Sequence, residues 1–437
     1  MKPETTTNRR TMLRNTSVLS ATVVAATTSS RFVHATESSS SDPDRVIKLG
    51  IIGAGGRGAG ALNDSLSINE NVQLIAMADI ERNNCVRTRD LLKRRHGDKV
   101  MVKENQIHVG IDAYKKILEN SEVELVLIAS PPGFHPSQIA EAVKAGKHVF
   151  AEKPSCVDVA GYKICLAAHD EAEKNGTAIV TGTQYRRQVN YVEAVKRIHD
   201  GEIGDIVSAQ SRYCSNGIWY KNRKEGMSDT QYQIDNWMHF IWLSGDQICE
   251  QAVHNIDAMN WVMGGAPETA YGSGGRFTRP ENSELWDSMA VDYVYPGNRV
   301  LSFMCRQIPS TQGDNGNIIY GTQGIAYIDA MSGGSRFVDW SGKETWSQKG
   351  SISDAYQQEH KDLVDSIRAG KPIVELRQTA DSSLTAVMGR LACYTGQLVD
   401  WDFMTTKSKL DLFPEPLDFN GERPPSDYAV PGKVKLT

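Results

Sequence analysis

The chain has 437 residues, of which 40% are hydrophobic and 23% are charged, so it is long enough for two or three globular domains. The first 35 residues hold five basic groups and one acidic group, and because the whole chain has a net charge of −5, the remainder carries −9. This negative charge argues against nucleic acid and anionic membrane surfaces as general partners. The seven cysteines form no CxxC pair, so we predict neither a disulfide framework nor a zinc site.

Residues 1–35 have the order of features found in an export signal. Arg9 and Arg10 precede the stretch TSVLSATVVAA, which is too short and too rich in hydroxyl groups to span a bilayer. The segment resembles a twin-arginine signal peptide with cleavage after Ala35, and a disordered basic N-terminus is the alternative. We therefore expect a linker over residues 36–45, export to a bacterial periplasm, and no membrane insertion after cleavage.

Residues 46–154 alternate between apolar strands and amphipathic helices. The runs VIKLGII, VQLIAMA, ELVLIAS and HVFAE have the length of strands and are separated by segments of helical pattern. This alternation predicts an α/β domain of Rossmann type, with a doubly wound parallel sheet covered by helices on both faces.

The character of the sequence changes within residues 155–412. After one more helix and the strand TAIVTG, segments such as DIVSAQSRYC and DSMAVDYVYPGNRVLSFMC are rich in β-forming residues, and PGN is a tight-turn signal. We predict an α+β domain with a large, mostly antiparallel sheet. The helical region 355–399 is expected to pack back on the first domain, and residues 413–437 are expected to form an extended tail.

The sequence GAGGRG follows the first apolar strand, opens a helix and matches the pattern GxGxxG. In this pattern Gly53 permits a tight turn, Gly55 lets the backbone approach a pyrophosphate, and Gly58 lets helix and strand pack closely. Gly56 and Arg57 lie between them at the helix N-terminus, where amide groups and the helix dipole favour phosphate. The pattern therefore predicts a dinucleotide-binding site.

Asp79 ends the next predicted strand, at the spacing from Gly58 that the dinucleotide pattern requires. A carboxylate there accepts hydrogen bonds from ribose hydroxyls and repels a 2′-phosphate, so we predict NAD rather than NADP. Arg82 is close enough in sequence to keep NADP as an alternative cofactor. A plain helix cap is the alternative interpretation of Asp79.

The sequence AEKP ends another strand of the parallel sheet, and ligands of such sheets bind at the carboxyl edge. Lys153 is therefore predicted to point into the ligand crevice. A solvated lysine at an exposed strand end is the alternative.

The segment from Glu250 to Asp257 predicts one helix with Glu250, His254 and Asp257 near one face. Histidine exchanges protons near neutral pH, and a neighbouring carboxylate fixes its tautomer. A salt bridge on the helix surface and a metal site are alternatives, although no third metal ligand stands in a recognisable motif. Since no GxSxG elbow or Walker loop is present, dinucleotide redox chemistry is favoured.

Residues 216–245 are rich in bulky aromatic side chains interleaved with polar ones. The aromatic residues are Trp219, Tyr220, Tyr232, Trp237 and Trp242. Such a mixture suits a sugar, whose apolar face stacks while its hydroxyls form hydrogen bonds. A loop that covers the domain with core aromatics is an equally good interpretation.

The glycine pattern, Asp79, the segment SPPGFHPSQIAEAVKAGKHVFAEKP (130–154) and the HNID helix occur in an order that resembles the glucose-fructose oxidoreductase / inositol dehydrogenase / MocA (Gfo/Idh/MocA) family. The resemblance covers about residues 46–265, and more loosely the helices from EHKDLVDSIRAGKP onward. It implies an NAD(P)-dependent oxidoreductase acting on CH–OH groups.

In that family the lysine of EKP and the histidine of the HxxD helix flank the reacting substrate carbon, which implies Lys153 and His254 as catalytic residues. Either of them could act as the base. The family often has aspartate four residues before the histidine, where this chain has Glu250, which we expect to orient His254. The other expected cofactor contacts are Ser130, Pro131, His135, Glu152, Lys153 and Gln184. The expected substrate contacts are Tyr185, Arg186, Trp237 and Asp257.

Together these features predict an exported NAD-dependent oxidoreductase acting on a secondary alcohol of a sugar, cyclitol or glycoside. Its cofactor must stay bound and be reoxidised in place, because an exported enzyme cannot exchange its cofactor with a cytoplasmic pool. The N-terminal tether is expected to slow the escape of the cofactor. We expect a homodimer or homotetramer. The alternatives are an NAD-using glycosidase of the same fold, a branch that lacks the EKP lysine, and a non-catalytic sugar-binding protein, which needs neither Lys153 nor His254.

Overall fold

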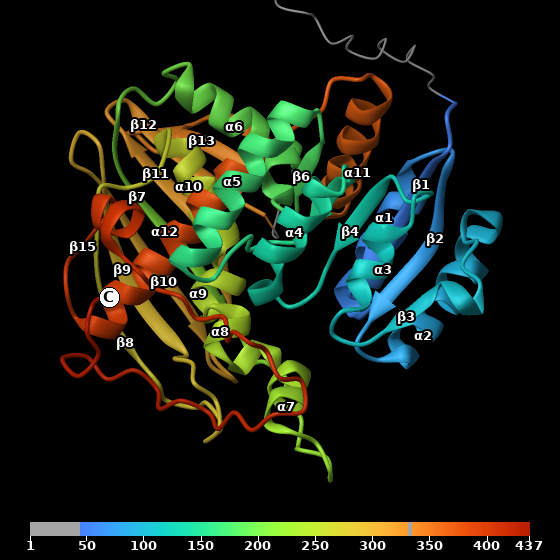
Figure 1. Cartoon of the computed structure of the whole chain (residues 1–437). Coiled ribbons are helices and arrows are strands. Elements are labelled where there is room, and N and C mark those ends of the chain that lie inside the picture. The colour runs from blue at the N-terminus through green and yellow to red at the C-terminus, as the bar shows by residue number, and fades with distance from the viewer. Residues whose placement is uncertain (1–43, 331–333) are drawn as a thin grey trace, which may run out of the picture. The chain divides into compact units, whose positions relative to one another are not determined.

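Two β-sheets organise the chain (Figure 1). A six-stranded sheet has the order β3-β2-β1-β4-β5-β6, and a nine-stranded sheet has the order β14-β13-β12-β11-β7-β10-β9-β8-β15. The computed structural model describes residues 44–330 and 334–437. The expected signal peptide (1–35) and the expected linker up to residue 43 lie outside the described residues. Within the part that is described, no helix combines the length and the apolar character needed to cross a membrane.

The first sheet is parallel throughout, as expected from the alternation of strands and helices. Strands such as β4 (LVLI) are buried at every residue because helices cover both faces of the sheet. The elements of this domain are β1 (Ile47–Ile52), α1 (Gly56–Ile68), β2 (Val72–Asp79), α2 (Arg82–His96), η1 (Gly97–Lys99), η2 (Glu104–Gln106), β3 (Ile107–Val109), α3 (Ala113–Glu119), β4 (Leu125–Ile128), η3 (Pro132–Phe134), α4 (His135–Lys144), β5 (His148–Ala151), α5 (Val159–Asn175) and β6 (Ile179–Thr181).

The parallel sheet continues past Pro154, where we placed the end of the first domain. Helix α5 crosses over, and β6 pairs in parallel with β5, with Val149 opposite Ile179. The AEKP sequence therefore begins a crossover connection inside the sheet rather than a linker between domains. This places Lys153 at the carboxyl edge of a strand that has neighbours on both sides.

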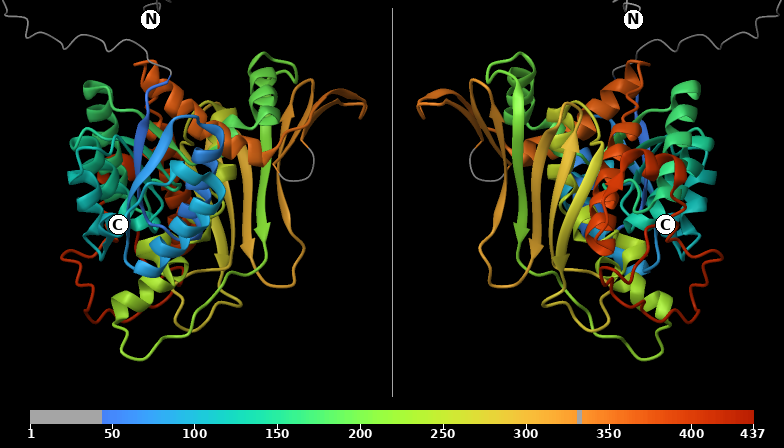
Figure 2. Two further views of the ribbon diagram at one scale, coloured as in Figure 1. Left: turned by 90° about the vertical axis from the view of Figure 1, so that its right-hand side faces the viewer. Right: turned by 90° about the vertical axis from the view of Figure 1, so that its left-hand side faces the viewer.

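The second sheet is mostly antiparallel, with one parallel pair between β7 and β10. Strands β9 and β10, joined by the predicted PGN turn, alternate between buried and exposed residues because helices lie against one face only (Figure 2). The elements here are η4 (Gln184–Arg187), α6 (Val189–His199), β7 (Ile206–Ser215), α7 (Asp229–Asp235), η5 (Trp237–His239), α8 (Ile241–Ser244), α9 (Gln247–Glu250), α10 (Val253–Met263), β8 (Thr269–Gly275), β9 (Ser288–Tyr295), β10 (Arg299–Gln307), β11 (Asp314–Gly321), β12 (Gly324–Asp329), β13 (Ser335–Asp339), β14 (Glu344–Gln348), α11 (Ile352–Arg368), α12 (Leu376–Thr395), β15 (Val399–Asp400) and η6 (Phe403–Lys407).

The C-terminal helices join the two sheets, as expected. Helix α11 packs on α1, and its Leu363 and Val364 belong to the same apolar cluster as Ile47 and Leu49 of β1. Helix α12 packs against α5, α10 and strand β8, and nearly all of its residues are buried. Residues 413–437 form no helix or strand, in agreement with the expected extended tail.

The prediction of one helix from Glu250 to Asp257 is wrong. Helix α9 ends at Glu250 and α10 begins at Val253. In a continuous helix the main-chain carbonyl of Glu250 would accept from the amide of residue 254, but here it accepts from the ammonium group of Lys153. The Glu250 carbonyl oxygen thus contacts a distant lysine at the point where the helix is interrupted. Glu250 and His254 therefore belong to different helices.

Candidate functional site

A continuous cleft runs from the carboxyl edge of the parallel sheet to the nine-stranded sheet. Its first part, the nucleotide cavity, has a volume of about 590 Å³ and is lined by the β1–α1 turn and the ends of β2, β3 and β4. The central cavity of about 320 Å³ shares Arg57, Ser130 and Trp237 with it. The third part, the sheet cavity of about 590 Å³, shares Gln184 and His254 with the central cavity. The shared walls make the three cavities one cleft.

The glycines of the β1–α1 turn leave space where a pyrophosphate needs it. A Cβ on Gly53, which has a φ of +86°, would come within 2.7 Å of the Ala129 backbone, and one on Gly58 would come within 2.0 Å of the Gly53 carbonyl oxygen. By contrast, a Cβ on Gly55 or Gly56 would meet nothing within 4 Å, and both residues line the nucleotide cavity. The turn is therefore closely packed at Gly53 and Gly58 and open to the cavity at Gly55 and Gly56. This arrangement fits a dinucleotide at the N-terminus of α1.

Asp79 lies at the edge of the nucleotide cavity and also holds its wall together. Its carboxylate accepts from the Ala54 amide at 2.7 Å and from the Glu81 amide at 2.9 Å. Arg82, which kept NADP as an alternative, contacts Glu104 at 2.5 Å and does not line the cavity. Arg87, which the sequence analysis did not single out, does line it.

Lys153 points into the central cavity, as predicted, and is paired there with Glu250. Its Nζ lies 3.0 Å from Glu250 Oε1 and donates to the Glu250 carbonyl oxygen, and both side chains are about nine-tenths buried. The other carboxylate oxygen accepts from Gln251 Nε2 at 2.5 Å. In the part of the chain that the structure describes, no hydrogen bond joins Glu250 to His254. Glu250 therefore orients Lys153, not the imidazole that we expected it to orient.

His254 lines both the central cavity and the sheet cavity. Its ring lies at a tilt 5.3 Å from the ring of Tyr185, and its buried Nδ1 has no hydrogen-bond partner among the described residues. Burial lowers the pKa of His254 well below its ordinary value, and the positive charges of Lys153 and Arg57 lower that pKa further. The imidazole is therefore neutral near pH 7 and can accept a proton.

Arg57 and Glu152, two expected cofactor contacts, meet where the nucleotide and central cavities join. Arg57 Nε donates to Glu152 Oε1 at 2.6 Å, and the guanidinium lies 4.5 Å from the ring centre of Tyr356 on α11. His135 binds the carbonyl oxygens of Ser130 and Pro154, each at 2.8 Å, and so ties the ends of β4 and β5 together. Tyr356 was not among the expected contacts, because no motif in the sequence distinguishes it within the helical region 355–399.

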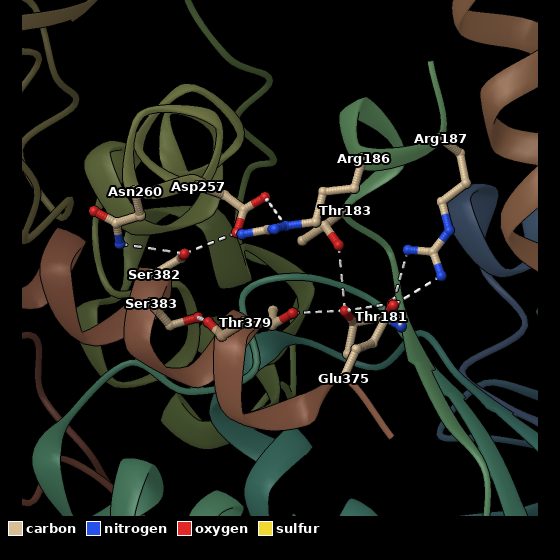
Figure 3. A network of polar contacts seen from close by, with 10 residues as sticks. All are labelled: Thr181, Thr183, Arg186, Arg187, Asp257, Asn260, Glu375, Thr379, Ser382 and Ser383. Carbon is tan, nitrogen blue, oxygen red and sulfur yellow. Dashed lines mark hydrogen bonds and ion pairs between the residues drawn. The ribbon is translucent and has the colours of Figure 1, made fainter. Parts of the chain in front are cut away.

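Arg186 and Asp257, expected to contact substrate, instead bind each other. Two hydrogen bonds of 2.8 and 2.9 Å join them, and Ser382 on α12 donates to the same carboxylate at 2.8 Å (Figure 3). Neither residue lines the central or the sheet cavity, so we no longer assign them to the substrate. Their pair fixes η4 against α10 and thereby positions Gln184 beside His254.

A second part of the same network anchors η4 from the other side. Arg187 donates to Glu375 at 2.7 and 3.0 Å, and Glu375 accepts from the amide of Thr181 on β6 at 2.7 Å (Figure 3). These buried charge-assisted contacts leave η4 little freedom. The rigid wall then presents Gln184 and Tyr185 to the sheet cavity.

Two residues that line the sheet cavity have buried amide oxygens without a partner. Gln184 donates through Nε2 to Tyr356 at 3.2 Å, but its Oε1 is buried and has no partner among the described residues. The Oδ1 of Asn315 is likewise buried and has no partner among those residues. Both side chains thus have unused hydrogen-bonding capacity close to this cavity.

Four of the five aromatic residues that we singled out in segment 216–245 form two groups. Tyr232 and Trp242 are buried in the core, as the covering-loop interpretation expected. Trp219 and Trp237 line the nucleotide cavity instead, and neither of them lines the sheet cavity. Trp237, which we expected at the substrate, therefore lies at the junction of the nucleotide and central cavities.

Comparisons with known proteins agree with this geometry. A family model described as "Oxidoreductase family, NAD-binding Rossmann fold" matches residues 47–180, and one described as "GFO/IDH/MocA C-terminal domain" matches residues 191–327. The chain is 25% identical over 207 residues to scyllo-inositol 2-dehydrogenase (NAD⁺) of Bacillus subtilis, covering 45% of this chain and 54% of that protein. It is 26% identical over 217 residues to α-N-acetylgalactosaminidase of Tannerella forsythia, covering 46% of this chain and 45% of that protein. The chain thus spans about half the length of these two relatives.

The fold is also similar to that of solved structures. The aldose-aldose oxidoreductase of Caulobacter crescentus superposes with a TM-score of 0.63 at 18% identity, covering 82% of this chain and all of that one. The two family models together match well over half of the chain, and the first of them describes an NAD-binding domain, as the sequence predicted. The chain belongs to the Gfo/Idh/MocA family of NAD-binding oxidoreductases.

Proposed function

We propose that the protein is an exported NAD-dependent oxidoreductase acting on a secondary alcohol of a sugar, cyclitol or glycoside. The observation that carries this proposal is the central cavity, where Lys153 and His254 face one space that opens to the nucleotide cavity on one side and to the sheet cavity on the other. A cofactor in the first and a polyol in the third would meet between these two side chains.

The two side chains have different roles in the proposed reaction. NAD, when bound, would supply the acceptor for the hydride of the alcohol carbon. His254, neutral because burial lowers its pKa, accepts the hydroxyl proton. The Lys153 ammonium, held in place by its ion pair with Glu250, stabilises the negative charge that develops on the same oxygen. The structure therefore supports His254 as the base.

The charges of the sheet cavity favour an uncharged substrate. Asp314 and Asp329 line it, whereas no lysine or arginine is found among its described lining residues. Asp314 is partly neutralised by Arg212 at 3.1 Å outside the lining. A carboxylate or phosphate on the substrate would lack a cationic partner among these lining residues. We therefore propose a neutral polyol rather than a sugar acid or sugar phosphate.

Export by the twin-arginine route implies that the protein folds around NAD before it leaves the cytoplasm. Such an enzyme must regenerate its cofactor in place, either with a second carbonyl substrate or by returning the hydride to the same molecule. The aldose-aldose oxidoreductase of similar fold carries in its name a reaction between two sugars, which is consistent with the first route.

We also propose a homodimer or homotetramer, because Val207, Tyr271 and Met304 expose apolar side chains on strands of the nine-stranded sheet.

A redox-neutral glycosidase is the second candidate, since one relative is an α-N-acetylgalactosaminidase. The presence of Lys153 favours net oxidation, because the glycosidase branch lacks this lysine. The test is to incubate the purified protein with neutral sugars, inositols and aryl glycosides, with and without added NAD, and to measure NADH, ketone and free aglycone. Release of aglycone without formation of ketone would favour the glycosidase activity over the dehydrogenase activity. If the protein neither converted any of these substrates nor bound NAD, both proposed activities would be refuted.

A further inference from the structure

We propose that residues 219–237, held from outside by the C-terminal tail, form a cap that retains the adenosine half of the dinucleotide in the nucleotide cavity. This inference rests on the proposed use of NAD and adds a part of the binding site that the glycine pattern does not include. Trp219, Lys221 and Trp237 are its principal contacts with the cofactor.

The cap forms one wall of the nucleotide cavity. Opposite the β1–α1 turn and the strand ends of the first domain, the cavity is lined by five residues of the cap. They are Trp219, Lys221, Ile234, Asp235 and Trp237. A ligand seated against Gly55 and Asp79 would therefore lie between the parallel sheet and a segment that is distant in sequence.

The cap residues are held in place by their own hydrogen bonds. The Trp219 carbonyl oxygen binds His239 Nε2 at 2.8 Å, and the Lys221 amide donates to Asn236 Oδ1 at 2.8 Å. Lys221 Nζ also lies 2.5 Å from Asp235 Oδ1. The irregular strand at 219–221 is thus fastened to the helical turns at 235–239, and the wall is a preformed surface.

Apolar contacts fasten the cap to the first domain. Phe134, which follows β4, belongs to one apolar cluster with Tyr232 and Ile234 of the cap. Ile80 and Ile111, at the ends of β2 and β3, pack against the same cluster. Opening the cap would expose this apolar surface to water, which opposes release of a bound cofactor.

The C-terminal tail ties the cap down from outside. Ser228 Oγ donates to the Phe419 carbonyl oxygen at 2.8 Å, Gln233 Nε2 donates to the Arg423 carbonyl oxygen at 2.6 Å, and the Arg423 amide donates to Asp229 Oδ2 at 2.7 Å. These bonds bracket helix α7. The tail and cap are thus proposed to slow cofactor escape; the N-terminal tether, of which we expected the same effect, lies outside the described residues.

The chemistry of the cap suits the adenosine half of a dinucleotide. Trp219 is 41% exposed although it lines a cavity, so its ring can be reached by a base that stacks on it. The Lys221 ammonium lies 5.0 Å from the centre of that ring and is neutralised by Asp235 on the same wall. The wall therefore suits a planar base, and removal of the ammonium would leave the Asp235 carboxylate without this partner beside the cofactor.

The test compares NADH release from the full chain and its variants. The proteins are loaded with NADH and mixed with excess NAD, and the loss of bound-NADH fluorescence gives the dissociation rate; NAD retained through gel filtration gives the stoichiometry. Since stacking of a base on an aromatic ring strengthens binding appreciably, Trp219→Ala with Trp237→Ala should release NADH about 10- to 100-fold faster. Lys221→Met, whose side chain is half exposed, should give a smaller increase without disturbing the fold. Trp340→Ala is the matched control, because Trp340 is 59% exposed and does not line the cavity.

Equal rates of NADH release in the wild type, the double variant and Lys221→Met would overturn the proposed role of the cap. A wild type that oxidises alcohols but exchanges NADH within milliseconds would overturn the cap and leave the proposed function standing. A wild type that binds neither NAD nor NADP would overturn the proposed function itself. A double variant that fails to unfold cooperatively is set aside, and Lys221→Met then decides.

Discussion

The pairing of Lys153 with Glu250 predicts different outcomes for stability and for activity. Loss of stability on replacing Lys153 should be reversed when Glu250 is replaced as well, whereas the loss of activity should remain. Replacing Lys153 with methionine keeps the apolar stem and removes the ammonium group. It leaves Glu250 as a carboxylate that is about nine-tenths buried and retains only the hydrogen bond from Gln251. Replacing both partners, in Lys153→Met with Glu250→Gln, removes the stranded charge.

The cost of the single substitution follows from this burial. Breaking one side of a buried ion pair costs about 3–5 kcal/mol, and the bond from Gln251 places Lys153→Met near the lower end. With an unfolding entropy of about 2.1 cal/mol/K per residue and roughly 400 folded residues, ~3 kcal/mol corresponds to a fall in Tm of about 4 °C. The double variant should regain most of this loss.

Activity should behave differently. Both variants should lose about 10²-fold or more in kcat, because the charge that stabilises the reacting oxygen is absent in each. The charge of Lys153 also lowers the pKa of His254, so its removal raises that pKa. Since the base must be neutral, the acid limb of the kcat/KM profile should move to higher pH in both variants.

The assays are thermal unfolding, and single-turnover NADH formation over a range of pH with the wild type, both single variants and the double variant. The reasoning is refuted if Lys153→Met alone is as stable as the wild type, or if the double variant regains activity together with stability. A pH profile that does not move would show that Lys153 and His254 are not coupled.

Three further predictions follow from the same cleft. His254→Ala should lower the rate of hydride transfer by about 10²-fold or more, while NAD binding measured by calorimetry stays nearly unchanged. The acid limb of the wild-type kcat/KM profile should lie below the ordinary histidine pKa of about 6.5. An unimpaired variant would remove His254 from the mechanism. Asp79→Ser should narrow the preference for NAD over NADP in Kd and also lower Tm, because Asp79 accepts the Ala54 and Glu81 amides; an unchanged cofactor ratio would point to Arg87 as the discriminating residue. Neutral inositols or hexoses should be oxidised with kcat/KM at least about tenfold above the matching uronic acids at pH 7, and a preference for the acids would contradict the charge of the sheet cavity.

Much of the first domain follows from local pattern. The turn at Gly53, the helix N-terminus at Gly55 and the acid at Asp79 are separated by fixed short spacings, and each has a conformational or chemical reason that can be stated without the rest of the chain. Lys153 could be placed at the carboxyl edge because strands of a parallel sheet end on one side. The richness in β-forming residues and the PGN turn likewise predicted strands of the second sheet.

Contacts between distant segments could not be predicted in the same way. The spacing from Glu250 to His254 suits one helix, but the structure ends a helix at Glu250 and directs its carboxylate to Lys153, 97 positions earlier. Arg186 and Asp257 look like ligand contacts until the fold brings them 2.8 Å apart in the interior.

The sequence by itself determined the cofactor domain, the catalytic lysine and histidine as candidates, and the order of the two sheets, since these depend on periodicity and on motifs with local geometry. Only the tertiary structure decided which carboxylate pairs with which cation, which polar groups are satisfied internally, and that Trp219 and Trp237 belong to the nucleotide cavity. The physical reason is that burial and pairing are properties of positions in space, and a side chain's charge state and free hydrogen-bonding capacity depend on neighbours that the linear order does not specify.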